Sequence, residues 1–296
     1  MNATALYFSI VCALSVALIS LISSQLYKKE PLLNSELMSF ISFAPGLIYS
    51  GFTIFNISSS VSAYILFSLL IKNFFYCLSF YYRYESLRKF GPFIGALMLG
   101  TQPIIIFLFG LLLLGETLSS FQILSVGLTT SALILLTTRN NSGEISINFA
   151  GFTKYYLFPT LASALAIIWD RYFLNGKFPS SEFFIIDRFT LVPAFLLSLA
   201  FIKGKNFRKS LWQNHYKYIL ENNWKALSSS AFLFTLSVYA YNMALELEKA
   251  ALVGLFRNAA YPLAAFVGTF WFKQRLTKIQ WVSLSLILLS MYLGFA

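Results

Sequence analysis

The stretch FGPFIGALMLGTQPIIIFLFGLLLLGETLSSFQILSVGLTTSALILLTT occupies residues 90–138 and holds two apolar runs on either side of a short polar turn. The first run, 90–114, contains Pro103, and the turn begins at Gly115. Each run is long enough to cross a bilayer, because a membrane-spanning helix needs about 20 apolar residues. The stretch therefore predicts two membrane helices joined by a tight connection.

The same order of features recurs in the second half of the chain. Before the turn, an offset of 159 residues places Pro103 on Pro262. After the turn, an offset of 158 places Gln122 on Gln280. A constant offset with one single-residue slip indicates an internal duplication. We therefore expect an N-terminal repeat at 1–139, a polar linker at 140–150 and a C-terminal repeat at 151–296.

The composition indicates an integral membrane protein. Hydrophobic residues make up 58% of the chain and charged residues 11%, whereas a soluble domain carries about a quarter charged residues. The formal net charge of +11 does not indicate nucleic acid, because the basic residues are dispersed and no binding motif accompanies them. Lys and Arg instead accumulate in the cytoplasmic loops of membrane proteins. The expected partner is therefore the lipid bilayer and not nucleic acid.

Ten apolar runs are long enough to be spans: 4–26, 33–54, 60–82, 90–114, 118–138, 151–174, 181–202, 224–245, 250–272 and 277–295. Five precede the linker and five follow it, so the two halves enter the membrane in opposite orientations. Inverted repeats of this kind are typical of secondary transporters. The predicted fold class is an all-α integral membrane protein of ten transmembrane helices, arranged as two inverted five-helix repeats.

The basic residues predict the orientation in the membrane. Alternate connections carry nearly all of them: Lys28, Lys29, Arg83, Arg88, Lys89, Arg139, Lys154, Lys203, Lys205, Arg208, Lys209, Lys217, Lys225, Lys273, Arg275 and Lys278. The opposite connections carry Arg171, Lys177 and Lys249. The positive-inside rule then places both termini outside, and we expect the inner membrane of a bacterium. The connection 204–223 is predicted either as an amphipathic helix on the membrane surface or as a solvated loop.

The repeated unit resembles the EamA-like branch of the drug/metabolite transporter superfamily. The features that carry the resemblance are Pro103 within a span, the turn Gly115-Glu116-x-Leu118-Ser119-x-x-Gln122, and Gly127 in the span that follows. The resemblance implies a ten-helix secondary transporter whose central cavity is formed by both halves. It also implies substrates as varied as amino acids, nucleotide sugars, phosphorylated sugars, choline-like compounds and drugs.

The sequence departs from the family pattern at three points. The second turn has Gln274-Arg275 where the first has a glycine and an acidic residue. An arginine that is frequent early in the family's second helix is missing, whereas its counterpart in the seventh helix is present as Arg188. The usual orientation of the family, with the termini inside, is opposite to the one that the loop charges predict here.

Lys72 lies near the centre of a predicted span, on one polar stripe with Tyr64, Ser68 and Tyr76, and Asn73 flanks it. A spacing of four residues places such side chains on one helix face. Polar groups within a bilayer usually face a cavity or a partner. Two interpretations stay open: a cavity wall whose ammonium binds an anionic group of the substrate, or a lysine paired with an internal carboxylate.

Arg257, Asn258 and Tyr261 form a second polar group, within the ninth span. The repeat aligns the first two with Met98 and Leu99, so the polar residues belong to one half alone. That asymmetry favours substrate recognition. The alternative is an arginine that extends to the nearer membrane interface.

Asp187 and Arg188 lie about two turns into the seventh span. Because adjacent residues point about 100° apart on a helix, we do not expect them to pair with each other. Asp187 is predicted to pair with Lys72 or Arg257, to carry a coupling proton, or to form a structural ion pair. Asp170, by contrast, is predicted to be interfacial because it lies near the end of its span.

Gln102 precedes a helix-interior proline, which leaves a carbonyl without its donor, and is predicted to face the cavity or to bond a neighbouring helix. Trp169 completes the predicted substrate-binding set: Ser68, Lys72, Asn73, Tyr76, Gln102, Trp169, Asp187, Arg188, Arg257, Asn258 and Tyr261. Glu116 is predicted to be a cap or loop contact. The repeat-related glycine pairs Gly95 and Gly254, and Gly110 and Gly268, are predicted to be close-packing sites between helices.

The three deep cations, Lys72, Arg188 and Arg257, outnumber the one deep carboxylate that the sequence suggests. We therefore predict an alternating-access transporter of a small anion-bearing metabolite: an amino acid, an organic acid or a nucleotide- or phosphate-bearing compound. A coupling proton or a counter-substrate is a possible second partner, and the protein is expected to be a monomer or a homodimer.

A flippase for a lipid-linked sugar is a second candidate function, because it would share the fold. A membrane enzyme acting on lipid-linked substrates would need a metal cluster or paired acids, but His215, the single histidine, has no metal-ligand spacing around it. Cys12 and Cys77 lie in apolar runs and are expected to be small buried hydrophobes. We therefore predict no enzymatic activity, no metal and no cofactor.

Overall fold

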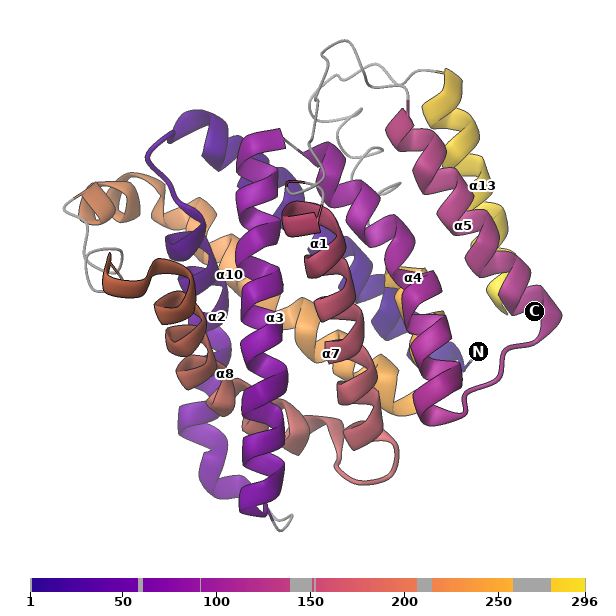
Figure 1. Ribbon diagram of the computed structural model, residues 1–296, viewed down its shortest axis with the longest axis horizontal. Helices are drawn as coiled ribbons and strands as arrows, with labels where there is room; N and C mark the ends of the chain where they lie inside the picture. Colours follow the sequence, from indigo (N-terminus) through magenta and orange to yellow (C-terminus); the bar gives the residue numbers. More distant parts are fainter. Residues whose placement is uncertain are drawn as a thin grey trace.

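A computed structural model describes residues 2–57, 61–90, 92–138, 151, 153–206, 215–257 and 278–295. These ranges hold ten α-helices and no strand (Figure 1): α1 Ala3–Lys29, α2 Ser35–Thr53, α3 Ala63–Phe90, α4 Pro92–Leu114, α5 Ser120–Thr138, α7 Phe158–Leu174, α8 Ser180–Lys203, α10 His215–Leu247, α11 Ala250–Arg257 and α13 Lys278–Phe295. Three short helical turns are η1 Ile54–Asn56, η2 Thr153–Leu157 and η3 Gly204–Asn206. Each predicted span therefore contains a helix. The predicted linker and the end of the ninth span lie outside the described residues.

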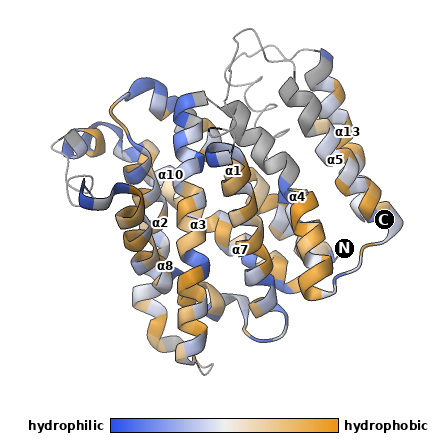
Figure 2. Ribbon diagram, viewed as in Figure 1, coloured by the Kyte–Doolittle hydropathy of each residue, from blue (hydrophilic) through white to orange (hydrophobic). Residues whose placement is uncertain are grey.

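Within the described residues, four helical segments are long and apolar enough to cross a membrane: Ala3–Lys29, Ala63–Ser86, Thr153–Leu174 and Ser180–Asn206. Figure 2 shows apolar residues along the middle of the helices and hydrophilic residues mainly near their ends. Large apolar side chains such as Phe52 and Phe201 are exposed on the outside of the bundle. An apolar exterior of this kind is suited to lipid, so the protein is an integral membrane protein.

The ends of the helices have identifiable physical causes. Asn2 and Asn34 cap α1 and α2, because each amide oxygen accepts a backbone N–H of the first turn at 2.9 Å. Gly115, in the connection between α4 and α5, has φ of 66°, a conformation that glycine adopts without steric cost. Glu116 accepts the N–H of Ala250 at 3.1 Å and so caps α11. The predicted role of Glu116 as a cap is confirmed.

The polar contacts join the helix ends into two separate groups. At one end of the bundle, Lys29 donates to Asn223 at 2.9 Å, and Lys203 pairs with Glu36. At the other end, Arg171 binds Glu116 at 2.9 Å, the N–H of Ser180 donates to Glu246 at 3.0 Å and the N–H of Asn2 to Glu248 at 3.2 Å. Both chain termini lie at this second end (Figure 1). The helices therefore run alternately between the two ends.

The helix contacts occur in related pairs. A contact between two helices recurs between the helices at the corresponding positions of the opposite halves. The α1–α10 contact corresponds to the α7–α3 contact, and the α3–α8 contact corresponds to the α10–α2 contact. The α4–α7 contact likewise corresponds to the α11–α1 contact.

Gly254 allows a close approach between helices, because a Cβ there would lie 3.1 Å from Ile106. Gly254 is therefore a close-packing site between helices, as the sequence predicts. At Gly110 a Cβ would lie 3.2 Å from Glu116, in the connection after the same helix, and 3.7 Å from Ile168 of α7, so its tight contact is not one between helices. The surroundings of Gly95 and Gly268 lie outside what the structure describes.

Candidate substrate-binding site

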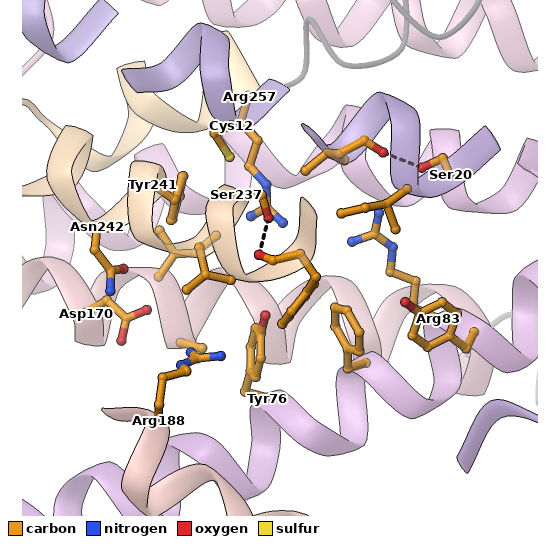
Figure 3. A pocket seen from close by; sticks show the side chains of 18 of the residues that line it. Cys12, Ser20, Tyr76, Arg83, Asp170, Arg188, Ser237, Tyr241, Asn242 and Arg257 are labelled. Carbon is orange, nitrogen blue, oxygen red and sulfur yellow. Dashed lines mark hydrogen bonds between the residues drawn. The ribbon is translucent and has the colours of Figure 1, made fainter. Parts of the chain in front are cut away.

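A cavity lies inside the bundle and is lined by α1, α3, α7, α8, α10 and α11. Its volume of about 50 Å³ has room for a few water molecules. Figure 3 shows Arg83, Asp170, Arg188 and Arg257 directed toward the same space from different helices. The cavity is therefore a charged interior space to which both halves of the chain contribute.

Lys72 sits between two carboxylates at one end of the cavity. Its Nζ atom lies 2.7 Å from Oδ1 of Asp170 and also binds Oδ1 of Asp187. Lys72 and Asp187 are 2% and 1% exposed. A buried charge is tolerated when it is paired and hydrogen-bonded. The structure thus places Lys72 in the internal ion pair that was the second interpretation of the sequence, while Lys72 also lines the cavity.

Asp187 and Arg188 pair with each other, so the expectation that they would not is wrong. Arg188 binds Oδ2 of Asp187 through both Nε, at 3.1 Å, and Nη2. The long arginine side chain bends back along α8 and so overcomes the 100° between the two residues. Gly46 of α2 makes room for this bend, since a Cβ there would lie 3.0 Å from Cδ of Arg188.

Asp170 is not interfacial, which corrects a second prediction. It lies one turn before the end of α7, where α7 packs on α3, and its side chain is directed inward to Lys72. Arg171, the next residue, points to the end of the bundle and binds Glu116. The interior therefore contains a second carboxylate beside Asp187, which the position of Asp170 near the span end concealed.

Asn73 joins α3 to α8. Its Nδ2 atom lies 2.9 Å from the backbone oxygen and Oδ1 of Asp187 and 2.9 Å from Oγ1 of Thr190. Trp169 similarly joins α7 to α3, because its Nε1–H donates to Ser68 at 2.9 Å. The cavity lining within the described residues does not include Asn73, Ser68 or Trp169, so these three of the predicted residues hold the helices that carry the site.

Tyr76 and Arg257 line the main cavity, and both also line a smaller neighbouring one. Arg257 lies over the ring of Tyr241, 4.9 Å from its centroid, a cation–π arrangement. Gln102 lines the smaller cavity and donates to Ser163 at 2.8 Å, so both interpretations of Gln102 hold. Asn258 and Tyr261 lie outside the described residues.

Arg83 is the residue of the site that the sequence interpretation missed most clearly. It was assigned to a positively charged connection, but α3 continues to Phe90 and Arg83 lines both cavities. The sequence contains a signal for this position. Arg83 follows Tyr76 by seven residues and Lys72 by eleven, and these spacings place the three side chains on one helix face. Tyr241 and Asn242 of α10 also line the cavity and had no such signal.

The fold and the site together define a polytopic helical membrane protein with a charged interior cavity. Residues 152–295, the C-terminal half, match the model of the EamA-like transporter family. This match confirms the resemblance seen in the repeated motif and indicates a membrane transporter of the drug/metabolite type. Members of that family are transporters rather than enzymes.

A solved structure, described only as the crystal structure of a protein, has the same fold. It superposes with a TM-score of 0.74 over 99% of this chain and 97% of its own, at 14% sequence identity. Similarity at this level concerns the fold alone. No curated protein matches the sequence significantly.

Proposed function

We propose that the protein transports a small metabolite carrying at least one negative charge, and that it does so by alternating access. The observation that carries the proposal is the charge of the cavity. Its lining contains four basic side chains, Lys72, Arg83, Arg188 and Arg257, and one carboxylate, Asp170. Asp187 is the second carboxylate bound to this group. An interior, positively charged space favours an anionic ligand.

The related helix contacts support the inverted-repeat arrangement. Exchange of the first five helices with the last five converts the α1–α10 contact into the α7–α3 contact, and the other pairs likewise. In transporters built from inverted repeats, the substrate site lies at the repeat interface. The lining of the cavity supports such a position, because Lys72 and Arg83 come from the first half of the chain and Arg188 and Arg257 from the second.

The size of the cavity supports a change of conformation during transport. A volume of about 50 Å³ holds a few water molecules and is too small for a metabolite. The lining helices therefore have to separate before a substrate enters. In the proposal, each end of the bundle opens in turn around the same charged residues.

Among the basic residues, we assign the main contact with the anionic group to Arg83 and Arg257. Arg83 and Arg257 border both the main and the smaller cavity, and the smaller cavity adds the polar groups of Gln102. Arginine suits this role because its planar fork binds carboxylate and phosphate groups through two hydrogen bonds.

The test is a thermal-shift screen of the purified protein against amino acids, organic acids, nucleotides, sugar phosphates and cationic amines. A ligand of the folded state stabilises it by about 2.7 kcal/mol at 100 times its Kd. We expect an anionic compound to stabilise wild type and Lys177→Gln, a control at the far end of the bundle, but neither Arg257→Gln nor Lys72→Ala. A cationic best hit, or equal responses of all four proteins, would contradict the proposal.

A flippase for a lipid-linked sugar ranks second, and one observation favours it. An apolar groove between α2 and α10 opens on the outside of the bundle and is lined by residues such as Phe40, Ile48 and Trp224. An acyl chain fits such a groove. The groove and the charged cavity share no lining residue, which is why transport of a water-soluble metabolite is preferred.

A further inference from the structure

The two carboxylates that bind Lys72 are held very differently. Asp187 also accepts from Arg188 and from Asn73, at 3.1 and 2.9 Å, and is 1% exposed. Asp170 is 16% exposed and lines the cavity. Within the described residues, its hydrogen-bonding partner is Lys72 alone. Asp187 is therefore fixed as an anion by two cations, whereas Asp170 depends on one shared cation and has access to water.

We propose that Asp170 is the residue that binds the coupling proton of this transporter. The link to transport rests on the proposed function, but the binding of the proton does not. A carboxylate that takes up a proton needs water access and few competing cations, and of the two interior carboxylates Asp170 has both. Asp187, the residue that the sequence suggested for this role, has neither.

The groups around Asp170 determine what its protonation changes. The charged or titratable groups that share the cavity lining with it are Lys72, Tyr76, Arg83 and Tyr84 of α3, Arg188 of α8, Tyr241 of α10, Arg257 of α11 and Cys12 of α1. Asp187 of α8 joins them through Lys72. Protonation of Asp170 leaves Lys72 and Arg188 with Asp187 as their shared carboxylate. The site then gains one positive charge that is not matched by a carboxylate.

A substrate anion supplies the missing negative charge. In the proposed cycle, water in the open cavity delivers a proton to an Oδ atom of Asp170 and the N–H···O bond from Lys72 weakens. The anion then binds in the cavity against Arg83 and Arg257, which share its lining with Lys72. After the opposite end opens, the anion leaves and Asp170 returns its proton to water and rebinds Lys72. One proton then moves with one negative charge in the same direction, so that the loaded site carries no extra charge across the membrane.

The test measures the proton itself and uses no substrate. Infrared difference spectra of the protein in liposomes, recorded while the pH is changed, detect the C=O stretch of a protonated carboxyl group. We expect a carboxyl band that titrates in wild type and disappears in Asp170→Asn. Asp170→Glu keeps a carboxyl group at the position and should restore a titrating band. Asp187→Asn and Glu116→Gln, which remove carboxylates elsewhere, should retain it.

Two results would overturn the proposal. One is that Asp170→Asn keeps every titrating carboxyl band of wild type, whatever Asp187→Asn does. The other is that wild type has no titrating carboxyl band. The thermal-shift screen is independent of this outcome: if no anionic compound binds while the Asp170 band is present, the proposed substrate class is wrong and the proton site stands.

Discussion

The ion-paired group around Lys72 shows how a membrane protein keeps charges in its interior. One ammonium, one guanidinium and two carboxylates balance one another, and Asn73 donates to Asp187 at 2.9 Å. Burial of unpaired charges is costly, and removal of one partner from a buried pair leaves the other without compensation. The group therefore fixes the relative positions of α3, α7 and α8.

Replacement of Lys72 by Met should accordingly be severe. The variant leaves Asp170 and Asp187 without their shared cation, and we expect a loss of about 3–5 kcal/mol in the free energy of unfolding. Lys217→Met is the matched control, because Lys217 is 85% exposed and lies 3.9 Å from Glu221, a surface pair of little value. Unfolding in detergent, followed by circular dichroism, measures both. Equal stability of the two variants would show that the buried group contributes nothing.

At the scale of the elements, the helix positions were largely predictable but their extents were not. α10 begins at His215, whereas the predicted span begins at 224. Asn223 has φ of −127° and ψ of 16°, a kink at the predicted boundary. The helical segment before this kink buries Ile219 and exposes Tyr218, as expected of the amphipathic helix that was one of two predictions for this connection.

α2 contains two glycines that provide a matched pair of tests. Gly46 faces Arg188, and an added Cβ would lie 3.0 Å from Cδ of that side chain, whereas a Cβ at Gly51 meets nothing within 4 Å. We expect Gly46→Ala to destabilise the protein by about 1–3 kcal/mol, as overpacking does. Gly51→Ala should be neutral or stabilising by up to about 1 kcal/mol.

The midpoint of thermal unfolding of the purified variants checks this pair. A Gly46→Ala midpoint at or above that of Gly51→Ala would mean that Arg188 has another way to reach Asp187. The contact with Arg188 would then not explain why α2 has a glycine at position 46.

For the whole molecule, the charges are separated between the two ends of the bundle. The end of the bundle that contains Glu36 and Asn223 holds four lysines at or near helix ends: Lys29, Lys89, Lys154 and Lys203. Both chain termini lie at the other end of the bundle. Positively charged ends remain in the cytoplasm, so we propose that both termini are outside. This proposal is opposite to the usual orientation of the family that the chain resembles.

Cysteine labelling in intact cells tests the orientation. Lys177 and Lys205 lie in exposed connections at opposite ends, and the two native cysteines are buried. A membrane-impermeant maleimide added outside should label Lys177→Cys and leave Lys205→Cys unlabelled, with wild type as the background. Labelling of Lys205→Cys alone would reverse the orientation and place the basic end outside.

The sequence by itself predicted ten apolar runs, in the order in which the described residues contain ten α-helices, because about 20 apolar residues in succession are a local property. It also determined the turn at Gly115, which depends on neighbouring residues and a repeated motif, whereas the N–H that Glu116 caps belongs to Ala250, 134 residues further along the chain. Only the tertiary structure decided the partners within the site. Lys72 meets Asp170 and Asp187 at sequence separations of 98 and 115 residues. Helical periodicity gives the face on which a side chain lies, whereas the group opposite depends on how other helices pack, and this is why Asp170 and Arg83 emerged only from the fold.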